Sequence, residues 1–216
     1  MIFQRRQNVF CAFAFACLFL AAADAAAAPV RILMLGTSLT QGYGLPPGTE
    51  IPVLLQARLK ADGIDAKVVN ASVSGDTSAD GLSRLEWSLS GHPEAVIIEL
   101  GSNDALRGVR PAQTEKNLSA ILFRLKARRL PVLLLGMKAP RNLGPDYARA
   151  FDAMYPKLAK QYSAILYPLL LQGVALNPKL NQRDGMHPNA AGAKIIADLI
   201  YPDVKALARR AMAKVR

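Results

Sequence analysis

Five short apolar runs, each followed by a longer stretch with helical spacing, constrain the fold of this chain more than any other feature. The runs are almost free of charge along their whole length, as in strands that are buried on both faces of a parallel sheet. Repeated alternation of strand and helix favours a single three-layer α/β/α domain. The predicted strands are Arg31–Leu35, Lys67–Asn70, Ala95–Leu100, Val132–Leu135 and a weaker Ala164–Tyr167.

The helical stretches between the runs show amphipathic periodicity and helix punctuation. Pro52 near the start of the first stretch and Gly63 after its end follow the favoured order for a helix. Pro202 lies inside the last stretch and is expected to kink or split it. The predicted helices are Ile51–Asp62, Ser78–Leu89, Ala112–Arg129, Asp146–Gln161 and Asn189–Lys214.

The N-terminus has the pattern of an export signal. Arg5 and Arg6 precede an uncharged apolar run, and small residues with A-x-A spacing follow it. This pattern predicts a signal peptide over residues 1–28, cleaved between residues 25 and 28, and a mature domain over 29–216. The run is short for a membrane-spanning helix, so an uncleaved anchor is the alternative. We therefore expect an exported protein, periplasmic or secreted.

Cysteine content narrows the chemistry of the mature domain. The only two cysteines of the chain, Cys11 and Cys17, lie in the predicted leader. The domain therefore has no disulfide framework and no thiol nucleophile, and no metal or other cofactor is predicted for it.

The chain is strongly basic, with 27 Lys and Arg against 16 Asp and Glu, a formal charge of +11. A basic excess of this size is typical of proteins that bind nucleic acid or an anionic membrane. Many of the cations fall on predicted helix surfaces, as over residues 124–129 and 205–216, without interleaved aromatic residues for base stacking. We expect a solvated basic surface that contacts anionic lipid, and no nucleic acid partner. The oligomeric state is not readable from the sequence.

Polar loops follow the first three predicted strands, and a fourth precedes the last helix. Ligands of parallel α/β sheets bind beyond the carboxyl ends of the strands, which makes these loops the candidate site. The four segments are Gly36-Thr37-Ser38-Leu39, Ala71-Ser72-Val73-Ser74-Gly75-Asp76-Thr77, Gly101-Ser102-Asn103-Asp104 and Asp184-Gly185-Met186-His187.

One of the two histidines, His187, lies in a polar loop three residues after Asp184. A turn can bring the carboxylate to Nδ1, which leaves Nε2 free as a general base. Ser38, after a strand and a glycine, is a candidate nucleophile, although it also suits a helix cap or a phosphate-binding turn. His92 precedes the third strand, at the opposite end of the sheet, and is expected in a surface turn.

Acyl transfer also needs donors that face a developing oxyanion. The Ser38 amide, the Gly75 amide and the Asn103 side chain are candidates. Glycine and asparagine are also common in ordinary turns, so Gly75 or Asn103 alone is weak evidence for an oxyanion hole. Their joint placement at one edge of the predicted sheet is the stronger observation.

Together, these four segments resemble the SGNH hydrolases, also called GDSL esterases/lipases, in their periplasmic arylesterase, thioesterase and lysophospholipase branch. The resemblance implies a flavodoxin-like fold with Ser38, Asp184 and His187 as the catalytic residues. It also implies an oxyanion hole of Ser38, Gly75 and Asn103. The family usually has Asp where this chain has Thr37, so we expect tuned rather than abolished activity.

The resemblance implies hydrolysis of aryl or short acyl esters, and of lysophospholipids or acyl thioesters, through an acyl-serine. Met137 and Leu143, in the loop after the fourth strand, are the candidate substrate-binding residues. One alternative is a carbohydrate O-acetyl esterase that uses the same site. The other is a non-catalytic flavodoxin-like protein that binds an anionic ligand.

Overall fold

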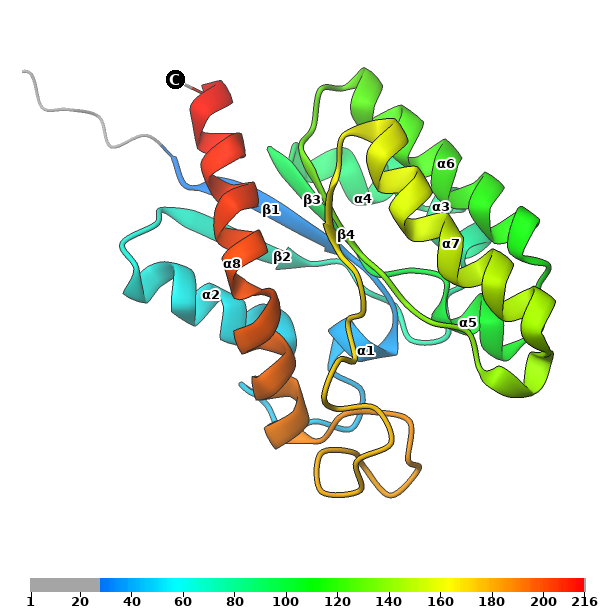
Figure 1. Ribbon diagram of the computed structural model, residues 1–216. Helices are drawn as coiled ribbons and strands as arrows, with labels where there is room; N and C mark the ends of the chain where they lie inside the picture. Colours follow the sequence, from blue (N-terminus) through cyan, green and yellow to red (C-terminus); the bar gives the residue numbers. More distant parts are fainter. Residues whose placement is uncertain (1–27, 216) are drawn as a thin grey trace, which may run out of the picture.

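The computed structural model describes residues 28–215 and shows a central sheet between two layers of helices (Figure 1). All neighbouring strands are parallel, in the order β2-β1-β3-β4-β5. This is the flavodoxin-like order, in which the chain changes direction between β1 and β3. The strands are β1 (Val30–Leu35), β2 (Ala66–Asn70), β3 (Ala95–Ile98), β4 (Val132–Leu135) and β5 (Ile165–Tyr167).

The long helices divide between the two faces of the sheet, which confirms the predicted three-layer α/β/α fold. Helices α2 (Ile51–Ala61) and α8 (Ala190–Val215) pack together on one face. Helices α3 (Ser78–Ser83), α6 (Pro111–Ala127) and α7 (Pro145–Tyr162) cover the other. The short helices are α1 (Ser38–Gln41), α4 (Leu85–Ser88), α5 (Ser102–Leu106), η1 (Leu89–Gly91) and η2 (Arg141–Leu143).

Burial explains why the apolar runs form strands. Every residue of β3 and β4 is buried, as expected where helices cover both faces of a sheet. Around α8, the fully buried side chains recur at helical spacing and face the sheet. They are Ala193, Ile196, Ala197, Ile200, Val204, Leu207, Ala208 and Ala211.

Two sequence expectations about helices differ from the structure. The expected split at Pro202 is wrong, because helix α8 continues through it with Ile200 and Val204 fully buried on either side; a kink there stays a prediction. The predicted helix Ser78–Leu89 is interrupted at Arg84, and its remainder forms α4 and η1. The amphipathic spacing of the sequence reveals neither the continuation of α8 through Pro202 nor the break at Arg84, because both depend on tertiary contacts.

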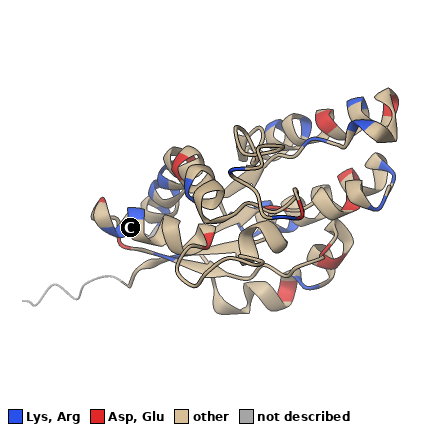
Figure 2. Ribbon diagram, turned by 90° about the horizontal axis from the view of Figure 1, so that it is seen from below, with Lys and Arg blue, Asp and Glu red and all other residues tan. Residues whose placement is uncertain are grey.

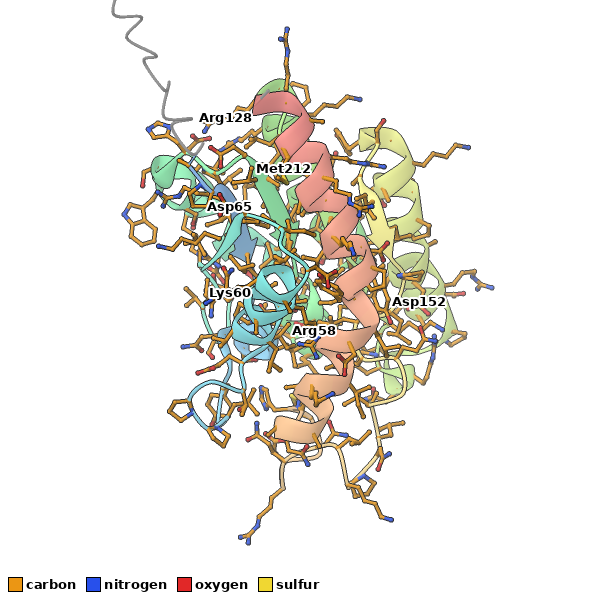
Figure 3. The ribbon with its side chains drawn as sticks, turned by 90° about the vertical axis from the view of Figure 1, so that its left-hand side faces the viewer. Arg58, Lys60, Asp65, Arg128, Asp152 and Met212 are labelled. Atoms are coloured by element: carbon orange, nitrogen blue, oxygen red, sulfur yellow. The ribbon has the colours of Figure 1, made fainter. Side chains whose placement is uncertain are left out.

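Side chains join the two helices of the α2/α8 layer. Arg58 extends from α2 toward α8, where its guanidinium pairs with Asp198 (Figure 3). Lys205 of α8 in turn pairs with Asp62, the residue directly after α2, at 2.6 Å.

Basic residues lie mainly on the outer surfaces of the helices, interspersed with acidic ones (Figure 2). Lys126, near the end of α6, and Arg129, just beyond it, line one surface pocket together with Arg210 and Lys214 of α8. Within residues 28–215, no helix is both long and apolar enough to cross a membrane. The predicted leader, residues 1–28, lies outside the described residues apart from Ala28.

Candidate active site

The four predicted loops meet beyond the carboxyl ends of β1, β2 and β3. Residues 36–38, the nucleophile turn, follow β1, and residues 71–77, the oxyanion loop, follow β2. The Val73 N–H donates to the Gly36 carbonyl at 3.0 Å, which joins these two segments. Asn103, in α5 beyond β3, donates its Nδ2 to the Asp76 carbonyl at 2.9 Å. The last loop closes the site, because His187 reaches Ser38.

A continuous hydrogen-bonded line runs from Asp184 through His187 to Ser38. Asp184 Oδ2 lies 2.6 Å from His187 Nδ1, and His187 Nε2 lies 3.0 Å from Ser38 Oγ. With Nδ1 protonated toward the carboxylate, Nε2 is the acceptor for the serine hydroxyl. The three side chains therefore have the geometry of a nucleophile, a base and a group that orients the base.

Asp184 is held in place by the turn that carries the histidine. Its Oδ1 accepts the backbone N–H groups of Met186 and His187, at 2.9 and 3.0 Å. These bonds, with the side-chain bond to His187, lower the pKa of Asp184 to about 2. Asp184 is therefore a carboxylate at any physiological pH, and it keeps the imidazole in one orientation. The ring of Tyr43 lies against His187, with centroids 4.7 Å apart.

Ser38 begins the short helix α1, directly after the buried Thr37. Thr37 does not cap this helix with its side chain; its N–H and hydroxyl instead donate to Glu99. Thr40, one turn on, donates to the same carboxyl at 3.1 Å. The Thr37 side chain therefore makes no helix-capping bond, and Ser38 Oγ faces the imidazole of His187.

Gly75 and Asn103, two of the candidate oxyanion donors, lie in the loops that meet at this site. Gly75 has φ of +85°, a left-handed conformation in which a side chain would be strained. Its carbonyl accepts a bond from Arg107 Nη2 at 2.8 Å. Asn103 uses one Nδ2 hydrogen toward Asp76, which leaves the second for another acceptor.

An apolar pocket opens beside Ser38 and His187. Met137 lines it, whereas the half-buried Leu143, in η2, is not among its lining residues. Lys138 is the one charged residue among those that line the pocket. The other apolar lining residues are Leu39, Ala105, Leu106, Pro140, Leu171 and Met186.

Two charged residues near the site, Glu99 and Arg84, are not predicted as site residues from the sequence. Glu99 is fully buried behind the nucleophile turn, and burial raises its pKa to about 7. Arg84 reaches the oxyanion loop and the end of β1. A glutamate inside an apolar strand run is a signal for the first, since buried carboxyl groups require partners. No comparable sequence signal marks Arg84.

Other sequence expectations concern histidine and metals. His92 is exposed, after η1 and before β3, at the amino end of the sheet as predicted. In the described part of the chain, no cluster of three or more His, Cys, Asp or Glu side chains could hold a metal ion.

Comparison with known proteins agrees with this architecture. Residues 34–195 match the model of the GDSL-like Lipase/Acylhydrolase family. The chain is 41% identical to Esterase TesA of Pseudomonas aeruginosa, over 88% of this chain and 96% of that protein. It is 43% identical to Thioesterase 1/protease 1/lysophospholipase L1 of Escherichia coli, over 84% and 86% of the two chains. The crystal structure of TesA superposes with a TM-score of 0.78 at 42% identity, over 82% of this chain and 99% of that one. The segments that build the site and the fold that carries them thus coincide with one family, and the chain belongs to the GDSL-like lipase/acylhydrolases, the SGNH hydrolases.

Proposed function

We propose that this ester hydrolase acts through Ser38 as the nucleophile, His187 as the general base and Asp184 as the group that orients it. The observation that carries the proposal is the hydrogen-bonded line Asp184–His187–Ser38, which ends beside an apolar pocket. A merely capped serine or a ligand-binding loop does not require an imidazole on the hydroxyl.

The reaction proceeds in two steps. His187 Nε2 takes the proton from Ser38 Oγ as the oxygen attacks the acyl carbonyl, and the imidazolium then protonates the leaving alcohol or thiol. In the second step, the same nitrogen takes a proton from water, which attacks the acyl-serine. The carbon–oxygen bond to Ser38 breaks, and His187 returns the proton to Oγ.

The oxyanion of each tetrahedral intermediate is held by the amides of Ser38 and Gly75 and by Asn103 Nδ2. The glycine conformation and the free second hydrogen of Asn103 support this assignment. Such donors stabilise charge that develops only in the transition state.

The substrates are carboxylic esters with an aryl or short acyl group, and lysophospholipids or acyl thioesters that place the acyl chain in the apolar pocket. The relatives named esterase, thioesterase and lysophospholipase support this range. Met137 contacts the acyl chain from the wall of the pocket.

The protein is exported to the periplasm or beyond by its N-terminal segment, and the leader is removed between residues 25 and 28. The basic surface that includes Lys126, Arg129, Arg210 and Lys214 contacts anionic lipid. N-terminal sequencing of protein from a bacterial periplasm tests the first statement. Salt-sensitive cosedimentation with phosphatidylglycerol vesicles, but not phosphatidylcholine vesicles, tests the second.

Labelling with a fluorophosphonate is the sharpest test of the catalytic assignment. Wild-type protein should incorporate one phosphonyl group on Ser38, and Ser38→Ala should incorporate none and lose about 10⁴–10⁶ in rate. Ser90→Ala, at the exposed serine of η1, is the matched control and should behave as wild type. Ester hydrolysis near the wild-type rate by Ser38→Ala would exclude the proposal.

A further inference from the structure

We infer that Arg84 is a positioning residue that fixes the nucleophile turn and the oxyanion loop relative to each other. The inference rests on the proposed function, since it assigns Arg84 to the same oxyanion hole. It adds a residue that lies outside the catalytic segments, in the break between α3 and α4.

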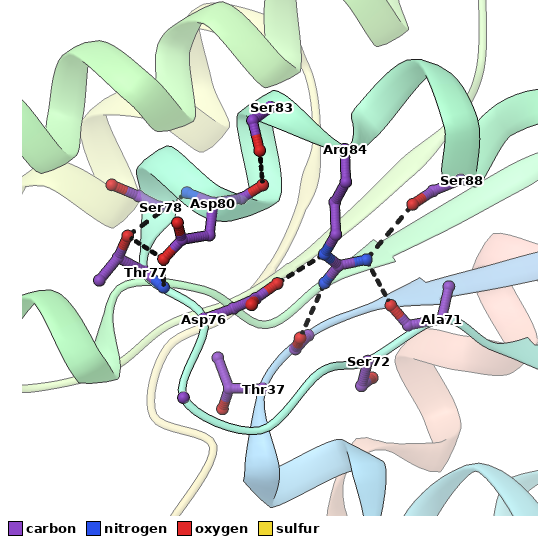
Figure 4. A network of polar contacts seen from close by, with 12 residues as sticks. Thr37, Ala71, Ser72, Asp76, Thr77, Ser78, Asp80, Ser83, Arg84 and Ser88 are labelled. Atoms are coloured by element: carbon purple, nitrogen blue, oxygen red, sulfur yellow. Dashed lines mark hydrogen bonds and ion pairs between the residues drawn. The ribbon is translucent and has the colours of Figure 1, made fainter.

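Arg84 joins segments from the ends of two strands. Its Nη2 donates to the Gly36 carbonyl at 3.1 Å, in the nucleophile turn after β1. Its Nη1 donates to the Ala71 carbonyl at 2.6 Å, after β2, and its Nε donates to Asp76 Oδ2 at 2.5 Å, in the oxyanion loop. Figure 4 shows the guanidinium between these groups, with a further bond to Ser88 Oγ at 3.3 Å.

Each candidate oxyanion donor lies within two residues of a group that Arg84 binds, or is bonded to such a residue. Gly36 precedes Ser38 by two positions, and Asp76 directly follows Gly75. Asn103 donates to the carbonyl of Asp76, the residue whose carboxylate Arg84 pairs with. The guanidinium thus constrains all three donors.

The chemistry of the contacts requires an arginine. A planar guanidinium offers five N–H donors in a fixed fork, whereas a lysine ammonium is a single point with three donors. The Arg84 and Asp76 side chains are only 16% and 13% exposed, so water does not readily replace the lost bonds. The helix also breaks at Arg84, between α3 and α4, at the point from which the side chain extends toward the sheet.

The test compares Arg84→Lys with Arg58→Lys in the full-length mature protein, with p-nitrophenyl acetate as substrate. Arg58 is a matched control, because its side chain is 19% exposed, pairs with Asp198 and donates to the Leu54 carbonyl, on the α2/α8 face. Active sites are titrated with the fluorophosphonate, so that kcat refers to folded protein. We expect Arg84→Lys to lower kcat about 10- to 100-fold with KM changed less than about threefold, because small displacements of donors weaken transition-state binding. Arg58→Lys should retain wild-type kcat.

Two further measurements separate positioning from a general structural role. Asn103→Ala should cost at least about fivefold less in the Arg84→Lys background than in wild type, because the two residues act on one oxyanion hole. Millimolar ethylguanidinium should restore part of the kcat of Arg84→Ala and none of that of Asn103→Ala.

Wild-type kcat in Arg84→Lys would overturn the inference, even with a lowered Tm. So would additive effects of the two substitutions. A wild-type protein that neither reacts with the fluorophosphonate nor hydrolyses the ester would instead overturn the proposed function itself, which keeps the two failures distinct.

Discussion

Thr37 donates both its backbone N–H and its hydroxyl to the buried carboxyl group of Glu99, at distances to Oε2 of 2.8 and 2.9 Å. Thr40 adds a third donor. Thr37 is the position where the family usually has Asp, and an aspartate there would face Glu99 as a second carboxyl group. The threonine gives Glu99 hydrogen-bond donors instead, directly behind the nucleophile.

Glu99 should make stability depend on pH. Burial raises its pKa from 4.5 to about 7, so the folded state binds this proton more tightly than the unfolded state. This contribution to the free energy of unfolding is on the order of 3 kcal/mol. It is fully present below pH 4.5 and is lost as the pH rises through 7. Urea unfolding of wild type and Glu99→Gln between pH 4 and 8 should show this loss in wild type alone. Parallel profiles for the two proteins would contradict the assignment, because the remaining groups titrate alike in both.

Asp184→Asn should lower kcat/KM about 10²- to 10⁴-fold without unfolding the protein. An asparagine can still accept the two backbone N–H groups of the turn, but its amide then presents donors to Nδ1 and favours the proton on Nε2. That tautomer cannot accept the Ser38 proton. Hydrolysis of p-nitrophenyl acetate measures the loss. Asp146→Asn, at the exposed start of α7, is the control and should leave the rate unchanged.

The architecture and the pairing of Asp184 with His187 could be predicted from the sequence because each has a local signal. The turn of Ser38 alone also suits a helix cap or a phosphate-binding loop, and the resemblance of the four segments to one family selects the nucleophile. The runs Val132–Leu135 and Ala95–Ile98 are buried throughout and read directly as strands. His187 and Asp184 lie three residues apart in one turn, and Ser38 follows a strand end. Each of these patterns occupies a few consecutive residues.

What escaped prediction depends on contacts between distant segments. Arg84 acts on Gly36, 48 positions away, and Glu99 on Thr37, 62 positions away. Leu143, predicted to bind substrate from its loop alone, lies in η2 and is not among the residues that line the pocket. Likewise, the helical periodicity of residues 78–89 does not reveal that the helix is interrupted at Arg84.

Asn103→Ala should lower kcat about 10²- to 10³-fold and leave KM nearly unchanged. Its amide donates to the Asp76 carbonyl through one hydrogen. In the proposed mechanism, the second hydrogen binds the oxyanion only as charge develops. Steady-state kinetics on p-nitrophenyl butyrate measure the split between kcat and KM. Asn142→Ala, at an exposed asparagine of η2, is the control. A rise of about 10²- to 10³-fold in KM with unchanged kcat would assign Asn103 to substrate binding instead.

Met137 should set acyl-chain preference, and Leu143 should not. Met137 is 7% exposed and lines the pocket beside Ser38, so Met137→Ala enlarges the space for the acyl chain. One methylene in an apolar pocket changes discrimination by about 10- to 200-fold at most. We therefore expect the ratio of kcat/KM for p-nitrophenyl octanoate over acetate to rise about 10-fold in Met137→Ala. Leu143→Ala should keep the wild-type ratio, because its side chain is outside the lining. Equal shifts in both variants would mean that the acyl chain extends over η2 rather than into the pocket.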